Sequence, residues 1–376
     1  MAVERSKSLI PLYKVNLPPN VAGIISDVTD TEQIATGPNV SIFEDLLRNY
    51  LGNPFVTTTG DISNSLSLCL FLAGVRPGDD VLMSPMVCLA TSCPVKNLFA
   101  NIRWCDVDPM TGNIDPADIP KRITPKTKAI VVYHWAGNPA ELDEIHAVAH
   151  AHNLAVIEDA GEAFGAEYHG KKIGATGSDF TVFSFYPNRH MTTIDGAAIT
   201  CVRQKDFEKA YWLKRYGIHQ PTFRCDDGEI NPASDIPIAG WNLYMNHLAA
   251  TIGVAQMEYI TGIVSRHQEN GMYYDKALAD IPGVTVLRRP TNSLSAYWVY
   301  TFLAQDRDHL LKRLTQAGVS ASKVHLRNDR YSCFDVNREK LPGVDYFSEH
   351  CLSIPCGWWV GLDERENIAQ MIRQGL

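Results

Sequence analysis

The sequence places an acidic side chain where an apolar strand is expected to end. Asp159 closes the apolar run of LAVIEDA, residues 154–160. In open parallel sheets ligands bind beyond the carboxyl ends of the strands, so a carboxylate at this position can pair with a buried cation. An aspartate that only caps a helix or a turn has the same pattern. Asp159 therefore marks a candidate ligand site without defining its ligand.

Other potentially reactive residues have simpler explanations. His146 and His150 are four residues apart in the helical segment HAVAHAH, but no nearby carboxylate or cysteine completes a metal site. We therefore expect a solvated helix face and no metal. Lys171 and Lys172 are expected in a surface turn. His134 follows an apolar strand, and either contacts a ligand or is bonded inside the protein.

The elements that position Asp159 alternate between two periodicities. From about residue 54 to 215, short apolar runs rich in β-branched residues alternate with segments of helical period, the pattern of a parallel sheet covered by helices. Strands are expected at 81–84, 102–108, 128–135, 154–160, 180–186 and 197–202. Helices are expected at 63–73, 90–100, 140–152 and 205–216. The sequence thus predicts an α/β fold with a central, mostly parallel sheet flanked by helices.

The remaining sequence has a different order. Residues 220–240 are polar and rich in Pro and Asp, and they are too long for a routine connection, so we expect a functional loop or a subunit contact. A long helix at about 247–280 precedes strands near 284–288, 296–304 and 319–326 and helices at 307–317 and from 363. We therefore expect a large α/β domain, residues 1–245, and a smaller C-terminal α+β domain, residues 246–376.

Composition narrows the class of protein. A net charge of −8 over 376 residues argues against binding to nucleic acid or anionic membranes by bulk attraction, so local groups must hold any anionic ligand. The nine cysteines form no CxxC pair, the first fifteen residues contain too short an apolar run for a signal peptide, and no segment reaches membrane-spanning length. We expect a cytoplasmic protein that binds neither nucleic acid nor membrane.

Six motifs in series carry a family resemblance. They are GPNVSIFEDLLRNYLGNPFV, AGVRPGDDV, CDVDPMTGNIDP, ITPKTKAIVVYHWAGNPAELDEI, VIEDAGEAFGAEYHGKKIG and FSFYPNRHMTTIDGAA, and VHLRNDRYSCF and IPCGWW follow them. In this order and spacing they resemble the DegT/StrS family of sugar aminotransferases of fold type I, which is related to the sugar 3-dehydratases. The resemblance covers nearly the whole chain. It implies the fold-type I aminotransferase architecture and a homodimer whose active sites combine residues of both subunits.

The resemblance also implies a set of cofactor-binding residues. Asp159 matches the aspartate that keeps the pyridine nitrogen of pyridoxal 5′-phosphate protonated, so that the ring acts as an electron sink. Glu162 matches the acidic or amide residue beside it. Ser184 matches the serine that hydrogen-bonds the cofactor phosphate, and Ser63 and Asn64 match the helix N-terminus that cradles it.

Further matches lie around the ring and the sugar. Cys88 lies where most relatives stack an aromatic side chain on the cofactor ring, although some branches have cysteine there. Asn246 matches a residue that the partner subunit places close to the substrate or the cofactor phosphate. His325 and Arg327 match the segment that lines the sugar end of the pocket. Arg327 either clamps a diphosphate through two parallel hydrogen bonds or forms a surface ion pair.

One position departs from the family. Arg189, followed by His190, stands where relatives carry the lysine that forms a Schiff base with pyridoxal phosphate. A guanidinium stays protonated and supplies neither a neutral amine nor a proton shuttle. We therefore expect pyridoxal or pyridoxamine 5′-phosphate to be held noncovalently. Nearby, Ile194 and Ala197 replace family glycines, which reduces the freedom of the backbone.

Three interpretations of Arg189 remain open at this point. In the first, lysine is the natural residue and arginine was introduced to trap an intermediate. In the second, the enzyme uses pyridoxamine phosphate without a Schiff-base lysine, as the keto-sugar 3-dehydratases do, and His190 is the general base. In those dehydratases, however, histidine occupies the lysine position itself. In the third, the chain is a noncatalytic homologue that binds a sugar nucleotide.

The leading prediction is amino transfer to a sugar. We expect an enzyme that moves the amino group of glutamate to a nucleotide-linked keto deoxysugar, with Asp159, Arg189 and His190 as the candidate catalytic residues. The nucleotide, the sugar and the carbon that is aminated are not encoded in any motif of the sequence.

Overall fold

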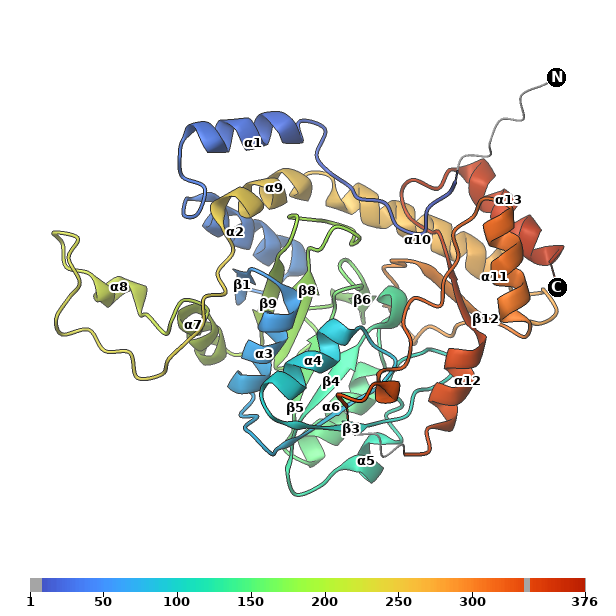
Figure 1. Ribbon diagram of the computed structural model, residues 1–376, viewed down its shortest axis with the longest axis horizontal. Helices are drawn as coiled ribbons and strands as arrows, with labels where there is room; N and C mark the ends of the chain where they lie inside the picture. Colours follow the sequence, from blue (N-terminus) through green and yellow to red (C-terminus); the bar gives the residue numbers. More distant parts are fainter. Residues whose placement is uncertain (1–8, 335–338, 376) are drawn as a thin grey trace.

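A seven-stranded sheet forms the centre of the protein (Figure 1). The computed structural model describes residues 9–334 and 339–375, so part of the expectation for the first fifteen residues lies outside it. The strand order is β1-β9-β8-β5-β4-β2-β3, with bounds Val56–Thr59, Ala197–Cys201, Phe180–Ser184, Ala155–Asp159, Thr127–Tyr133, Asp80–Met83 and Asn101–Trp104. β9 runs antiparallel to β1 and β8, while the pairs from β8 to β3 are parallel. The predicted, mostly parallel sheet is confirmed.

Helices cover both faces of this sheet. Alternate residues of β4 enter different cores: Ala129, Val131 and Tyr133 belong to one cluster, and Ile130 and Val132 to the other. The first core includes residues of α3 (Ile62–Leu72), α4 (Leu89–Asn97) and α7 (Gln204–Leu213). The second includes residues of α2 (Asn39–Leu51), α6 (Leu142–Ala151) and α9 (His247–Met257). Helix α5 (Ile119–Arg122) is short. The four predicted helices of this region are confirmed, with ends that differ by up to three residues.

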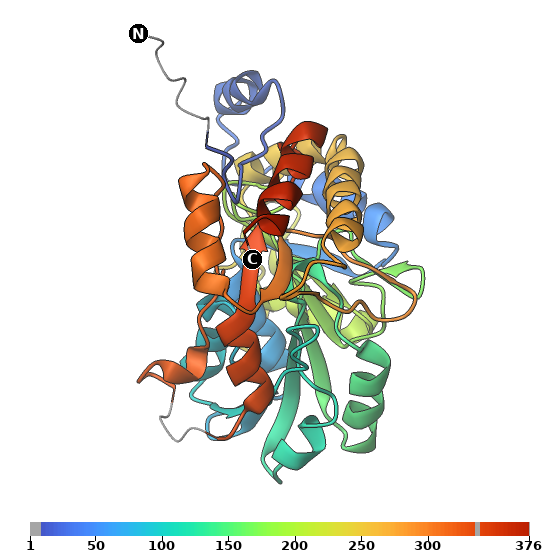
Figure 2. The same cartoon turned by 90° about the vertical axis from the view of Figure 1, so that its right-hand side faces the viewer.

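A second, three-stranded sheet follows in the chain (Figure 2). It contains β10 (Val284–Val286), β12 (Tyr300–Ala304) and β13 (Cys351–Ile354), all antiparallel, together with α11 (Arg307–Gln316), α12 (Pro342–His350) and α13 (Leu362–Arg373). A small third sheet joins β11 (Ser293–Leu294), β6 (Glu167–Tyr168) and β7 (Lys171–Lys172). The division of the chain into domains at residue 245 stays a prediction.

Two expected elements differ from the structure. The strand at 319–326 is wrong, because only isolated bridges form at Val319 and Ser322, and Val324 has a φ of 62°, which interrupts an extended run. The long helix at 247–280 is two helices, α9 and α10 (Ile260–Ala277), with a bend of 62° between them. Within the described ranges no single helix is long and apolar enough to cross a membrane, although this bent pair meets that test by length and composition.

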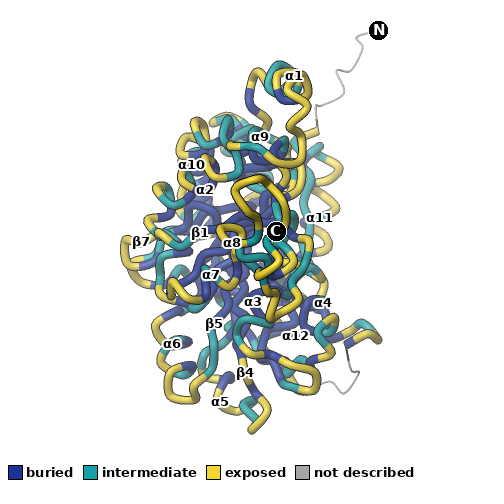
Figure 3. The backbone as a smooth tube through the Cα atoms, turned by 90° about the vertical axis from the view of Figure 1, so that its left-hand side faces the viewer, coloured by how far each residue is buried: buried dark blue, intermediate teal, exposed yellow. Residues whose placement is uncertain are grey.

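The segment that follows α7 extends away from the sheet. It contains α8 (Gln220–Phe223) at the left of Figure 1, and most of residues 220–240 are exposed (Figure 3). Helix α9 lies between two helices from the start of the chain: it packs against α2 and against α1 (Val21–Asp30). Neither α1 nor α2 was expected from the sequence.

A buried ion pair fixes the start of the sheet next to the candidate site. Lys214 Nζ lies 3.0 Å from Glu44 Oε1 and donates to Thr57 Oγ1 at 2.6 Å and to the Thr58 carbonyl at 3.0 Å. Burial raises the pKa of Glu44, but Lys214 and the hydrogen bond from the Thr58 N–H outweigh it and leave this pKa below its ordinary value. The pair thus ties α2 and the segment after α7 to β1, the strand that leads into α3.

Replacing Lys214 should destabilise the fold. In K214A the buried Glu44 carboxylate loses its counter-ion, so we expect the free energy of unfolding in urea to fall by about 3–5 kcal/mol. The matched control is K172A, because Lys172 pairs with Glu167 at a more exposed site and should contribute at most about 1 kcal/mol. Equal losses in the two variants would contradict this account of the Glu44–Lys214 pair.

Candidate active site

Asp159 is the last residue of β5 and is buried at the carboxyl edge of the parallel strands. Thr91 Oγ1 donates to its Oδ2 at 2.6 Å, and the Gly161 N–H donates to its Oδ1 at 3.0 Å. Burial raises the pKa of Asp159, and the two hydrogen bonds only partly oppose this effect. Because both bonded donors are neutral, a cationic N–H placed against this carboxyl would strongly favour its ionised form.

Three elements converge where the chain leaves β5. A Cβ atom on Gly161 would lie 3.0 Å from Ile62 at the start of α3, 3.1 Å from Asp159 Oδ1 and 3.4 Å from Ser184 Cβ at the end of β8. The carboxyl ends of β5 and β8 and the N-terminus of α3 therefore meet at one point. This is the geometry in which parallel α/β sheets bind phosphorylated ligands.

Glu162 is the centre of a buried polar network. Its Oε2 accepts from the Ala136 N–H at 2.8 Å, and its Oε1 lies 3.2 Å from His325 Nε2 and 3.4 Å from Arg189 Nη1. Tyr133 Oη, at the end of β4, lies 3.0 Å from the same His325 nitrogen. Burial raises the pKa of Glu162, but the hydrogen bond from His325 and the charge of Arg189 outweigh it and leave this pKa below its ordinary value.

Arg189 is enclosed by this network. Its guanidinium carbon lies 4.4 Å from the centre of the Trp298 ring, and Tyr13 stacks against Trp298 at 4.8 Å. Its Nε is buried with no hydrogen-bond partner among the described residues. Burial lowers the pKa of Arg189, but the charge of Glu162 and its other neighbours outweigh this effect and raise it, so the residue stays cationic.

The loop that carries Arg189 has an unusual backbone. Ile194 has a φ of 74°, a conformation that β-branched residues rarely adopt, and its side chain is 55% exposed. A glycine would adopt this conformation without strain, which agrees with the family pattern at this position.

His190 points into a different environment. Its Nε2 lies 3.0 Å from the Ala296 carbonyl oxygen, and its ring centre is 4.5 Å from that of His267, which bonds the Tyr297 carbonyl. Burial lowers the pKa of His190 well below its ordinary value. None of its hydrogen bonds in the described part of the chain reaches Asp159 or Glu162, so the structure does not bring this predicted catalytic residue together with them.

Some of the residues expected to hold the phosphate already form hydrogen bonds within the protein. Asp61 caps α3: its carboxylate accepts from the Asn64 N–H at 2.8 Å and from the Asn64 side-chain amide at 2.6 Å. Ser63 lies in the first turn of the helix, and Ser184 Oγ accepts from the Tyr186 N–H at 3.3 Å. Two hydroxyl groups and the α3 N-terminus thus fit a phosphate, whereas both donors of Asn64 are already bonded to the cap residue Asp61.

The other predicted site residues have varied surroundings. Cys88 is the N-cap of α4, and burial raises the pKa of its thiol. Asn246 caps α9 through a hydrogen bond from the Ala249 N–H at 2.8 Å. Arg327 forms two hydrogen bonds with Asp329, at 2.7 and 2.6 Å, and a third with Asp345. Its guanidinium forms the ion pair of the simpler interpretation, and the diphosphate clamp stays a prediction.

The histidines outside the site are bonded within the protein where the structure shows their partners. His134 is fully buried between Glu158, 2.7 Å from its Nε2, and the Ala140 N–H, which donates to its Nδ1 at 3.1 Å, so it is bonded inside the protein. Over residues 9–334 and 339–375, no group of three potential ligands that could hold a metal ion occurs. His146 instead bonds Ser178.

Sequence reasoning missed three contributors to the site: Thr91, Tyr133 and Trp298. A signal for Tyr133 exists, because successive strand residues point to opposite faces and Tyr133 pairs in register with Asp159. Tyr133 rather than His134 was therefore the residue to expect beside Asp159. Thr91 and Trp298 carry no such signal, since they reach the site from α4 and from the segment before β12.

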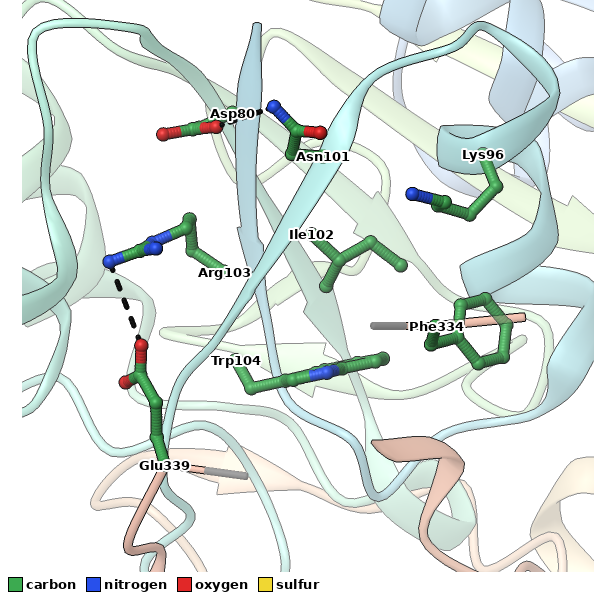
Figure 4. A pocket seen from close by; sticks show the side chains of 8 residues that line it. All are labelled: Asp80, Lys96, Asn101, Ile102, Arg103, Trp104, Phe334 and Glu339. Atoms are coloured by element: carbon green, nitrogen blue, oxygen red, sulfur yellow. Dashed lines mark hydrogen bonds and ion pairs between the residues drawn. The ribbon is translucent and has the colours of Figure 1, made fainter. Parts of the chain in front are cut away.

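A separate pocket lies along the edge strand β3 (Figure 4). It has a volume of about 320 Å³ and is lined by Asp80, Lys96, Asn101, Ile102, Arg103, Trp104, Phe334 and Glu339. None of the predicted cofactor or substrate residues lines it. The chemistry is therefore assigned to the carboxyl edge of the sheet and not to this pocket.

Comparisons with known proteins agree with this geometry. A sequence model of the DegT/DnrJ/EryC1/StrS aminotransferase family matches residues 20–373. The chain is similar to GDP-perosamine synthase of Caulobacter vibrioides, with 31% identity over 312 residues and 81% of each chain covered. Among solved structures it is similar to the sugar aminotransferase CalS13 from Micromonospora echinospora, with 33% identity, a TM-score of 0.92 and coverage of 98% of this chain and 100% of that one. It is also similar to AtS13 from Actinomadura melliaura, with 33% identity, a TM-score of 0.93 and coverage of 99% of this chain and 100% of that one. The predicted fold class is confirmed.

The buried His190–His267 pair should make stability depend on pH. Burial lowers the pKa of His267 to about 4, whereas an unfolded histidine titrates near 6.5. As pH falls from 7 to 5 the unfolded chain takes up protons that the folded chain does not, so the folded state loses about 2 kcal/mol of stability through His267. His190, whose pKa is also lowered by burial, adds to this loss. Urea unfolding at the two pH values measures this loss.

Variants separate this effect from other titrations. The unfolded chain of H267N has one histidine fewer and takes up one proton fewer, so its stability should fall less between pH 7 and pH 5. A variant of the exposed His152 should behave like the parent. The same pH dependence in H267N and the parent would show that His267 does not stay neutral in the folded protein.

Proposed function

Because the chain belongs to the DegT/DnrJ/EryC1/StrS aminotransferase family, we propose that it transfers an amino group to a nucleotide-linked keto sugar, with a vitamin B6 cofactor held noncovalently. The single observation that carries the proposal is the meeting of Asp159, Ser184 and the N-terminus of α3 around Gly161. The acid and the phosphate-binding groups of the expected cofactor site are thus close together.

The residues present suit the cofactor. When bound, pyridoxal or pyridoxamine phosphate supplies an electron sink for the carbon that reacts. Asp159 would hold the pyridine nitrogen in its protonated form, and its own raised pKa is the property expected of a buried carboxyl that lacks a cationic partner. Ser63, Ser184 and the backbone N–H groups of α3 would hold the phosphate. Cys88, the N-cap of α4, would contact the ring.

Arg189 determines how the cofactor is held. It is buried, cationic and paired with Glu162, so it cannot become the neutral amine that an imine bond requires. We therefore propose that either form of the cofactor is bound by hydrogen bonds, charge and ring contacts alone. Lysine at this position would find the same Glu162 carboxylate beside it.

The substrates and the assembly are inferred from relatives. The name of GDP-perosamine synthase supports a nucleotide-linked sugar for this chain, and glutamate is the proposed amino donor. We propose a homodimer in which Asn246 acts across the interface, and a cytoplasmic location. His325 would line the sugar end of the pocket, while Arg327 would require release from Asp329 and Asp345 to clamp a diphosphate.

The proposal is tested with the cofactor and the amino donor. Purified protein is incubated with pyridoxal phosphate, desalted, mixed with glutamate and assayed for 2-oxoglutarate and pyridoxamine phosphate in a single turnover. We expect the cofactor to be retained and both products to form. Loss of both pyridoxal and pyridoxamine phosphate on desalting would exclude the enzyme, and retention without 2-oxoglutarate would favour the binding-protein interpretation.

Replacing Arg189 by lysine should change the way in which pyridoxal phosphate is attached. In R189K an amine lies next to Glu162, so we expect a Schiff-base absorbance band that borohydride reduction fixes to residue 189. The matched control is R189Q, which removes the charge without adding an amine and should give no such band. If R189K forms no adduct while it retains the cofactor, residue 189 is not at the position from which the imine forms.

Replacing Asp159 should weaken catalysis more than folding. D159N keeps the size of the side chain and its contact with Thr91, but it removes the charge that supports a protonated ring nitrogen. We expect the single turnover with glutamate to slow by on the order of 100-fold. The matched control is D80N, because Asp80 is also buried but lies at the opposite end of its strand. Equal rates in D159N and the parent would remove Asp159 from the mechanism.

A further inference from the structure

One imidazole of the site is held by fixed partners at one nitrogen only. His325 Nε2 lies 3.0 Å from Tyr133 Oη and 3.2 Å from Glu162 Oε1. The ring centre is 5.7 Å from that of Trp135 and nearly perpendicular to it. The side chain keeps 16% of its surface exposed, and none of the hydrogen bonds formed by the described residues involves Nδ1. The ring is thus oriented from one side, and Nδ1 is left for a ligand.

The other candidate groups near Glu162 are poor proton carriers. Arg189 stays cationic in its pair with Glu162. His190 is buried against the Ala296 carbonyl and His267, and burial lowers its pKa well below the ordinary value. Burial raises the pKa of Tyr133 well above its ordinary value and raises that of Cys88. Both imidazoles keep an Nδ1 without a hydrogen-bond partner among the described residues, but that of His190 is buried inside the protein. The His325 side chain is 16% exposed, so its free nitrogen is the one that a ligand can reach.

We propose that His325 is the residue that transfers protons in this site, with Glu162 and Tyr133 as the positioning residues that orient its ring. The inference rests on the proposed function. In the step, a C–H bond of the bound substrate breaks, its electron pair stays with the ligand, and an N–H bond forms at Nδ1 of His325. The same proton is then returned to a carbon of the ligand, so no other reactant is needed.

The surroundings of His325 support both the uptake of a proton at Nδ1 and its return to the ligand. The Glu162 carboxylate, at the end of the β5 segment, stabilises the imidazolium that forms when Nδ1 takes a proton. Arg189, from the loop after β8, shares Oε1 of Glu162 and opposes a second positive charge, which favours return of the proton. Tyr133, the last residue of β4, and Trp135, which follows the strand, both pack against the His325 ring. Cys88, Asp159 and Tyr13 are further titratable neighbours of this network.

The test uses pyridoxal phosphate and glutamate as probes and three histidine variants. We expect H325A to retain the cofactor with an unchanged absorbance spectrum but to form 2-oxoglutarate about 100-fold or more slowly in a single turnover. Added imidazole should restore much of this rate, which a purely structural role of His325 would not allow. H169A is the matched control, because His169 also pairs with a carboxylate, Asp143 at 2.9 Å, but on the surface. H190A tests the rival histidine.

A second measurement does not depend on turnover. In protein labelled with ¹⁵N-histidine, we expect the ring resonances of His325 to shift when pyridoxamine phosphate is added, and E162Q to reduce that shift. If these resonances do not respond, the proposal is overturned.

The outcomes separate the two proposals. An H325A rate equal to that of the parent, or a slow rate in H190A that imidazole rescues, overturns the role of His325 and leaves the aminotransferase intact. No 2-oxoglutarate from the parent overturns the proposed function and the role of His325 with it.

Discussion

The carboxylate of Glu162 is buried completely, and the protein must compensate its charge from within. A buried charge without partners is strongly unfavourable, so the groups around it are constrained together. Arg189, His325 and the Ala136 N–H supply this compensation from three separate segments of the chain. The position of Arg189 over Trp298, the orientation of His325 and the end of β4 all follow from this requirement. The network therefore joins the parallel sheet to the segments around Trp298 and His325, which lie near the second sheet in the sequence.

Arg189 has a structural consequence as well as a chemical one. In an imine-forming enzyme the residue at this position must be able to lose its proton, whereas here the guanidinium is a permanent partner of Glu162. The same pairing keeps Glu162 ionised and leaves His325 with an anionic neighbour. Chemistry that an amine would perform must then be performed by a different side chain, and the geometry around His325 suits that task.

Local sequence signals predicted much of the fold and part of the site. Asp159 could be predicted because a short continuous apolar run ends there, and the helix that Asp61 caps could likewise be predicted from the local sequence. Two features depend on contacts between distant segments and could not be predicted. His325 and Glu162 are 163 residues apart. His190 is turned toward His267 in another part of the chain. The strand expected at 319–326 failed because the backbone at Val324 turns into a left-handed conformation that β propensity does not report.

The central claim is that this site holds its cofactor without a covalent bond. The most direct measurement is the intact mass of the protein loaded with pyridoxal phosphate, recorded under native conditions and again after borohydride reduction and denaturation. The account predicts one cofactor per chain in the native spectrum and no stoichiometric adduct after denaturation. A single reduced pyridoxyl group bound to one lysine of every chain would contradict it.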